Sequence, residues 1–176
     1  MFIEIEDLRD EPLEFHHTYG IGELAFERQD AALAQPVVAD FVLTHQDRDL
    51  HIVGGLGTSL RCRCARCASE FDRRVDNRFD LTYLPQPGGI EEKEEIELRY
   101  EEMDVAFYDG VRFDVDLMVT EQVELSLPMR LVCREDCRGL CYRCGQDLNE
   151  KDCGCPQEEK DDRLSVLLEF RKKMEQ

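Results

Sequence analysis

Polar and apolar residues alternate along three stretches of the chain, 39–44, 56–63 and 71–83. A period of two places every second side chain on the same face, which is the pattern of a half-buried β-strand. The apolar faces consist of Ala39, Phe41 and Leu43, then of Leu56, Thr58, Leu60 and Cys62, and then of Phe71, Val75, Phe79, Leu81 and Tyr83. Strands at this spacing, joined by short turns, predict an antiparallel β-sheet or a small barrel.

A helical period occurs in other parts of the chain. Valines repeat every four residues within 114–127, ahead of Pro128, and we expect a helix there that continues as an extended segment. Residues 161–174 have apolar positions at helical spacing and predict a C-terminal helix, and a short helix is expected over 30–34. Residues 1–8 alternate weakly and predict a first strand. The expected fold class is α+β, with a few helices on a sheet or small barrel.

The composition is acidic, because 22 Lys and Arg against 40 Asp and Glu give a formal net charge of −18. General binding to DNA or other polyanions needs many cations that face phosphates, so this balance disfavours it. The longest apolar runs are a few residues, far below the roughly 20 that a membrane-spanning helix needs. Acidic residues, and no apolar leader, follow the first methionine. We therefore expect a cytoplasmic protein with no membrane partner.

The charged residues are unevenly distributed along the chain. Residues 91–104 hold eight acids against Lys93 and Arg99, after prolines and glycines at 85–89. This run predicts a solvated loop near residues 86–104, with a docking surface for a basic protein as the alternative. A local group of basic residues lies elsewhere in the sequence, at Arg61, Arg63, Arg66, Arg73, Arg74 and Arg78.

Nine cysteines are an unusual number for a chain of 176 residues. Without a leader, we expect a reducing compartment, where clustered thiols more often bind metal than form disulfides. Cys64 and Cys67 form a C-x-x-C pair between two predicted strands, at the tip of a hairpin, and would supply half of a tetrahedral metal site. Cys62 continues the apolar face of its strand, so we interpret it as a small buried side chain.

A denser cysteine cluster follows residue 131. Its members are Cys133, Cys137, Cys141, Cys144, Cys153 and Cys155. The segment 141–145 has the form of a zinc knuckle, with a glycine after the second cysteine, and the last two cysteines could complete its site. Cys133 and Cys137 would then either belong to that site or share a second one with Cys64 and Cys67. The sequence predicts one or two structural zinc ions and leaves the partition open.

Motifs for catalysis are weak. The glycine-rich segment 54–59 lacks the lysine of a phosphate-binding loop and continues into a predicted strand. The four histidines are near no nucleophile or metal-ligand pattern, and neither C-x-x-C pair has the βαβ setting of a thioredoxin-like site. We expect no enzyme, and a thiol redox protein without metal remains an alternative.

Several motifs follow one another in a fixed order, over roughly 60–71 and 113–155. They are Cys64-Ala65-Arg66-Cys67, Asp114-Val115-Asp116-Leu117, Glu121-Gln122, Leu125-Ser126-Leu127-Pro128-Met129, the run from Cys133 to Gly145, Asn149 and Cys153-Gly154-Cys155. Their order and spacing resemble the YceD family, the large ribosomal RNA subunit accumulation proteins of bacteria and plastids. The resemblance implies a non-enzymatic factor needed for large-subunit ribosomal RNA to accumulate.

The leading hypothesis is therefore a ribosome biogenesis factor that helps to process, protect or assemble large-subunit ribosomal RNA. Guanidinium groups bind phosphates bidentately, so we expect RNA contacts from Arg61, Arg63, Arg66 and Arg73, unless nearby aspartates neutralise them. The alternative is a zinc-stabilised adaptor that binds a basic large-subunit ribosomal protein and makes no RNA contact. The expected domains are an α+β core over 1–130 and a metal-binding module with the C-terminal helix over 131–176.

Overall fold

The computed structural model describes residues 1–8, 11–46, 49–86 and 105–156. The chain divides into two compact units, one of Met1–Ala65 with Ser69–Cys133 and the other of Arg66–Ala68 with the chain from Arg134 onward. The expected acidic loop, apart from residue 86, and the expected C-terminal helix lie outside the described residues. The domain boundary between 130 and 131 stays a prediction.

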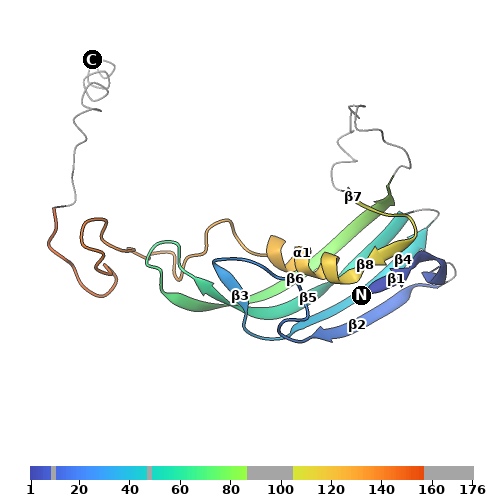
Figure 1. Ribbon diagram of the computed structural model, residues 1–176, viewed down its shortest axis with the longest axis horizontal. Helices are drawn as coiled ribbons and strands as arrows, with labels where there is room; N and C mark the ends of the chain where they lie inside the picture. Colours follow the sequence, from blue (N-terminus) through green and yellow to red (C-terminus); the bar gives the residue numbers. More distant parts are fainter. Residues whose placement is uncertain (9–10, 47–48, 87–104, 157–176) are drawn as a thin grey trace, which may run out of the picture. The chain divides into compact units, whose positions relative to one another are not determined.

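The first unit is built on an open sheet of six strands (Figure 1). The strand order is β2-β4-β5-β6-β7, with β3 paired to β5 beside this path. All neighbours are antiparallel except β6 and β7, which run parallel. The bounds are β2 Leu13–Tyr19, β3 Ala31–Leu33, β4 Val37–Gln46, β5 Asp49–Arg63, β6 Glu70–Pro85 and β7 Val105–Tyr108. Because the sheet does not close on itself, the small-barrel alternative is wrong.

The first unit also contains a separate pair of short strands, a 3-10 helix and an α-helix. Strand β1 (Phe2–Glu4) pairs antiparallel with β8 (Arg112–Asp114), and a 3-10 helix, η1, covers Ile5–Leu8. Helix α1 (Val115–Leu125) follows β8 directly and confirms the helix expected within 114–127. The Asp114 carboxylate caps this helix by accepting from the backbone N–H groups of its first turn. The described residues are thus mostly β-sheet with one α-helix.

The three alternating stretches of the sequence are strands β4, β5 and β6. The short helix expected over 30–34 is wrong, because Ala31–Leu33 form strand β3. These residues pair in antiparallel register with Leu60, Arg61 and Cys62 of β5. Backbone pairing with a long neighbouring strand has overridden a weak local helical pattern.

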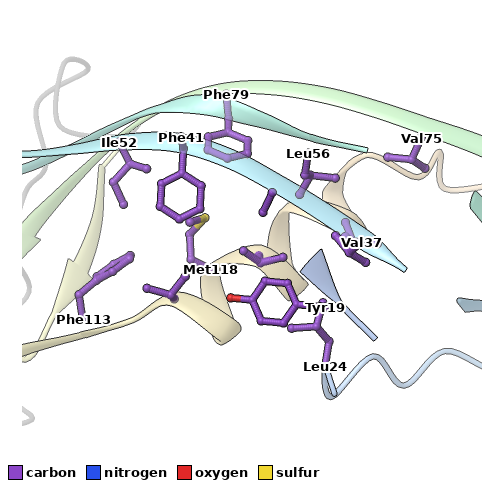
Figure 2. Packing of buried hydrophobic residues seen from close by; sticks show 14 of the residues in the cluster. Tyr19, Leu24, Val37, Phe41, Ile52, Leu56, Val75, Phe79, Phe113 and Met118 are labelled. Atoms are coloured by element: carbon purple, nitrogen blue, oxygen red, sulfur yellow. The ribbon is translucent and has the colours of Figure 1, made fainter. Parts of the chain in front are cut away.

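The hydrophobic core lies between the inner face of the sheet and α1. Figure 2 shows Phe41, Ile52 and Phe79 of the sheet together with Met118 of the helix. Buried side chains alternate with exposed ones along β4, as expected for a sheet covered on one face only. The Asn77 side-chain amide of β6 also donates to the backbone carbonyl of Gln122 in α1, at 3.2 Å. The helix is therefore attached to the sheet by both apolar packing and a polar contact.

Candidate metal centre

The turn between β5 and β6 positions the first C-x-x-C pair. The backbone N–H of Cys64 donates to the carbonyl of Ser69 at 2.8 Å, which closes the turn. The N–H of Ala65 donates to the carbonyl of Leu131 at 2.7 Å, and the N–H of Cys133 donates to the Cys64 sulfur at 3.4 Å. A segment far along the chain is thereby held beside the turn, and it brings another cysteine with it.

Four sulfur atoms converge here, those of Cys64, Cys67, Cys133 and Cys137, all within 4.8 Å of one another. We call these residues the first cysteine group. Three of the four are buried and Cys133 is half-buried. A zinc ion at about 2.3 Å from each sulfur requires sulfur–sulfur separations of about 3.8 Å in a tetrahedron, so the group could hold such an ion. The structure thus places the sulfurs of the two distant pairs together, while their sharing of one ion stays a prediction.

A second set of four sulfur atoms, from Cys141, Cys144, Cys153 and Cys155, also lies within 4.8 Å. These residues are the second cysteine group. The backbone N–H of Gly145 donates to the carbonyl of Cys141 at 2.9 Å, and Gly145 has a φ of +75°. Glycine adopts this left-handed conformation without steric cost, so its place after the second cysteine permits the tight turn. This group is more accessible than the first, since Cys144 is exposed.

The thiols of the second group differ in how readily they ionise. Backbone N–H groups of Cys144 and Arg143 that point at the Cys141 sulfur lower the pKa of this thiol to about 6. Hydrogen bonds with Cys153 and Cys144 raise the pKa of the Cys155 thiol to about 12. One thiol thus ionises readily, while a neighbour keeps its proton in hydrogen bonds with the other cysteines. Four sulfur atoms this close together are the donor set that a soft divalent metal prefers.

Arg66 holds residues 135–140 of the second unit in place. Its Nη1 donates to the backbone carbonyls of Glu135 and Cys137, at 2.9 Å each. Its own carbonyl accepts from the N–H of Leu140 at 3.0 Å. Gly139 has a φ of +76°, and a Cβ at this position would lie 2.9 Å from the Arg66 carbonyl oxygen. The close approach therefore requires glycine, and Arg66 has a structural role that the sequence did not reveal.

Asn149 is a further residue to which sequence reasoning assigned no role. Its side-chain Nδ2 donates to the sulfur of Cys137 at 3.4 Å, and its Oδ1 accepts from the backbone N–H of Arg138 at 2.8 Å. A third contact comes from Arg134, whose Nη2 donates to the same Oδ1. Partners of this kind orient metal ligands and stabilise the thiolate charge. The sequence signal that could have identified Asn149 is the presence of an amide side chain within the run of clustered cysteines.

Cys62 belongs to neither group. It is 1% exposed at the end of β5, and burial raises the pKa of its thiol. The interpretation of Cys62 as a small buried side chain is confirmed.

The four arginines expected at an RNA interface do not form one patch. Arg61 and Arg63 project from the outer face of β5, but Arg73 is opposite buried Leu60 and so belongs to the inner face. The Nε of Arg61 donates to Asp72 at 2.5 Å, and Arg66 is engaged as described above. Neither Arg63 nor Arg73 makes a side-chain hydrogen bond or ion pair within the described part of the chain. The RNA role of all four stays a prediction.

Comparison with known proteins places these features in a family. The model of the YceD family, described as large ribosomal RNA subunit accumulation protein YceD, matches residues 52–171. That range includes both cysteine groups. None of the helices in the described ranges has the length and apolarity needed to span a bilayer.

Curated relatives agree with the family model. The chain is 24% identical over 163 residues to "Large ribosomal RNA subunit accumulation protein YCED homolog 1, chloroplastic" of Arabidopsis thaliana, covering 80% of this chain and 50% of the relative. The protein of the same name from Zea mays is 23% identical, over 68% of this chain and 48% of the relative. An uncharacterized protein of Mycobacterium tuberculosis is 33% identical, over 61% of this chain and 48% of the relative.

The chain thus spans about half the length of the curated relatives it matches. No solved structure matches it. The family model covers well over half of the chain. The chain therefore belongs to the YceD family of large ribosomal RNA subunit accumulation proteins.

Proposed function

We propose that this protein is a non-enzymatic factor in the biogenesis of the large ribosomal subunit, and that it promotes the accumulation of large-subunit ribosomal RNA. The match of the family model over residues 52–171 carries this proposal. The names of the plant relatives support it, since both refer to accumulation of this RNA. The direct partner would be a precursor of that RNA, in the cytoplasm where we expect the chain to act.

The two cysteine groups would act as structural zinc sites. Each supplies four thiol ligands, which is the full complement of a closed tetrahedral site. A closed site leaves no coordination position for a substrate or an activated water, unlike a catalytic zinc site with three protein ligands. The proposed ligands are Cys64, Cys67, Cys133 and Cys137 for one ion and Cys141, Cys144, Cys153 and Cys155 for the other.

RNA contacts would come first from Arg63, whereas Arg73 lies on the other face of the sheet and would contact RNA separately. Arg63 is exposed at the end of β5, and its guanidinium has no partner within the described ranges. Arg61 would contribute by exchanging its bond to Asp72 for one to a phosphate, because an exposed ion pair is worth only about 0.2–1 kcal/mol. Arg66 would support the interface by holding the cysteine-rich segment in place.

A second candidate is an adaptor that binds a basic large-subunit ribosomal protein without touching RNA. Two observations favour it. The formal net charge of −18 attracts basic proteins and repels RNA. Arg61 and Arg66 are also already engaged with groups of the chain itself.

Sedimentation of the tagged protein, at its native level, through a ribosome gradient tests the proposal. We expect co-migration with precursors of the large subunit but not with mature ribosomes, and ultraviolet crosslinks to RNA that decrease in Arg63→Glu. Arg130→Glu is the matched control, because Arg130 is exposed and carries the same charge. Co-migration without RNA crosslinks would support the adaptor instead. Confinement to the top of the gradient after mild crosslinking would contradict the RNA role and favour an adaptor that binds free ribosomal protein.

A further inference from the structure

The outer face of the sheet carries a groove that neither cysteine group involves. It has a volume of about 1130 Å³ and runs along β5, between β4 and β6. Its floor consists of small residues at successive outward positions of β5, namely Gly55, Gly57 and Ser59. One wall includes Val38 and Asp40 of β4. Since the floor has almost no side chains, the backbone of this strand is open to contact from outside the sheet.

The other wall is a row of alternating charges on β6. Arg74, Asp76, Arg78 and Asp80 occupy consecutive outward positions, and all four are exposed. Successive residues on one face of a strand are about 6.6 Å apart. None of the four has a side-chain hydrogen bond or ion pair to any described residue. We call this row the charge ladder.

The acidic residues next to the charge ladder, unlike its own members, have ion-pair partners among the described residues of the chain. Asp72, one position earlier on the same face of β6, is held by Arg61 of β5. Asp40, across the groove, is paired with His16 of β2. The four members of the ladder thus remain available to a partner, and their charges sum to zero.

The order of charges along the ladder is complementary to the same order in the opposite direction. If two copies meet with β6 strands antiparallel, Arg74 faces Asp80 of the other copy and Asp76 faces Arg78. The same pairs recur on the other side of a two-fold axis, which is the symmetry of an isologous dimer. We propose that a second copy of this chain docks on this groove, so that the outer sheet faces of the two copies pack together through the charge ladder.

Charge favours a second copy over a nucleic acid as the occupant. A polyanion would meet Asp76 and Asp80 between the arginines, and each would repel a phosphate. The chain as a whole has a net charge of −18, so copies repel one another over most of their surface. The charge ladder is locally neutral, and exposed Val38 and Val53 beside it add apolar area. A dimer through this face therefore avoids most of that repulsion.

The size of the face sets the expected strength of the dimer. Three strands about 4.8 Å apart and eight residues of about 3.3 Å each give a patch of roughly 400 Å² per copy. This is below the roughly 800 Å² per partner of a standard stable interface, so the dimer would be weak and reversible. It would form at high micromolar concentration and dissociate on dilution.

Analytical ultracentrifugation of the full chain over a concentration series tests the proposal. We expect the mass to rise from the monomer value of 20.5 kDa toward twice that value. In Arg78→Asp, two cross-dimer ion pairs become two like-charge contacts, so the dissociation constant should rise by about tenfold or more. The double exchange D76R/R78D keeps opposite signs at the facing positions and should restore the wild-type dissociation constant. Arg130→Asp has the same charge change outside the ladder and serves as the control.

Three outcomes would overturn the proposal. The first is a chain that stays monomeric at all concentrations. The second is an equal effect of Arg78→Asp and Arg130→Asp, which would indicate net charge alone. The third is failure of the double exchange to restore association while its circular dichroism matches that of the wild type. Loss of RNA binding in Arg78→Asp, without any self-association of the wild type, would instead assign the face to a nucleic acid.

Discussion

The rings of Phe41 and Phe79 lie with their centroids 6.2 Å apart, on the two strands that flank Gly54 of β5. Gly54 is paired with Phe41 on one side and with Phe79 on the other, so two aromatic side chains cover a residue without a side chain of its own. A Cβ at position 54 would lie 2.3 Å from the Cβ of Phe41. The core of the sheet therefore depends on a glycine at this position.

Gly54→Ala should lower the free energy of unfolding by about 3 kcal/mol, because the added methyl group forces β4 and β5 apart. Gly57→Ala is the matched control on the same strand. Its Cβ would have a single neighbour, the Val75 carbonyl oxygen at 4.0 Å, so the change should stay within about 0.5 kcal/mol. Urea unfolding followed by circular dichroism measures both. Equal stability of the two variants would contradict the close approach at Gly54.

Native mass spectrometry with added zinc should find two ions per chain, because each cysteine group has a complete set of four ligands. C141S/C144S should retain one ion. Cys62→Ala should retain both, since Cys62 lies outside both groups.

Replacing all four cysteines of the first group by serine tests how the ligands are shared. With the observed grouping, one ion remains at the second group. If Cys133 and Cys137 instead shared an ion with Cys141 and Cys144, the same replacement would disrupt both sites and no ion would remain. Retention of two ions would also contradict the grouping.

The stability of the chain should fall at alkaline pH, partly through Tyr83. Burial raises the pKa of Tyr83 to about 12, and its ring packs edge-on against Phe113. A raised folded-state pKa means that the stabilisation is complete below the unfolded value of about 10 and is lost as pH rises from there toward 12. Between about pH 8 and about pH 11, the unfolding free energy of the wild type should therefore fall by about 1 kcal/mol more than that of Tyr83→Phe.

Urea unfolding at about pH 8 and about pH 11 checks this difference. The measurement at the lower pH isolates any effect of the missing hydroxyl on packing, because the phenol is protonated in both states there. An equal loss of stability in the wild type and Tyr83→Phe would show that the pKa of Tyr83 does not differ between the folded and unfolded states.

The sequence predicted the elements that have one buried and one exposed face. Strands β4, β5 and β6 alternate clearly because α1 covers only one side of the sheet, and the valines of α1 follow the helical period for the same reason. Strand β2 was missed because Glu14, His16, His17 and Thr18 are all exposed, so its residues do not alternate. Strands β7 and β8 are too short for a period to show.

The candidate site was predictable in its residue types but not in its grouping. Which cysteines share a centre depends on backbone contacts such as Ala65 to Leu131, which no local pattern encodes. The arginines are a different case. Strand alternation alone separates Arg61 and Arg63 from Arg73, so their distribution over two faces could have been predicted. The engagement of Arg66 by carbonyls of a distant segment could not.

The contacts of Arg66 impose an order on events during synthesis of the chain. Its two carbonyl acceptors are translated 69 and 71 residues later. The Arg66 guanidinium therefore cannot form these two hydrogen bonds until the rest of the sheet has been synthesised. Closing a loop of this length costs conformational entropy, which is offset only when the later segment forms its contacts with Arg66. The second unit is therefore among the last parts to mature. Until then its thiols are accessible to oxidants and to competing metals, and a nascent chain that stalls early leaves Arg66 exposed.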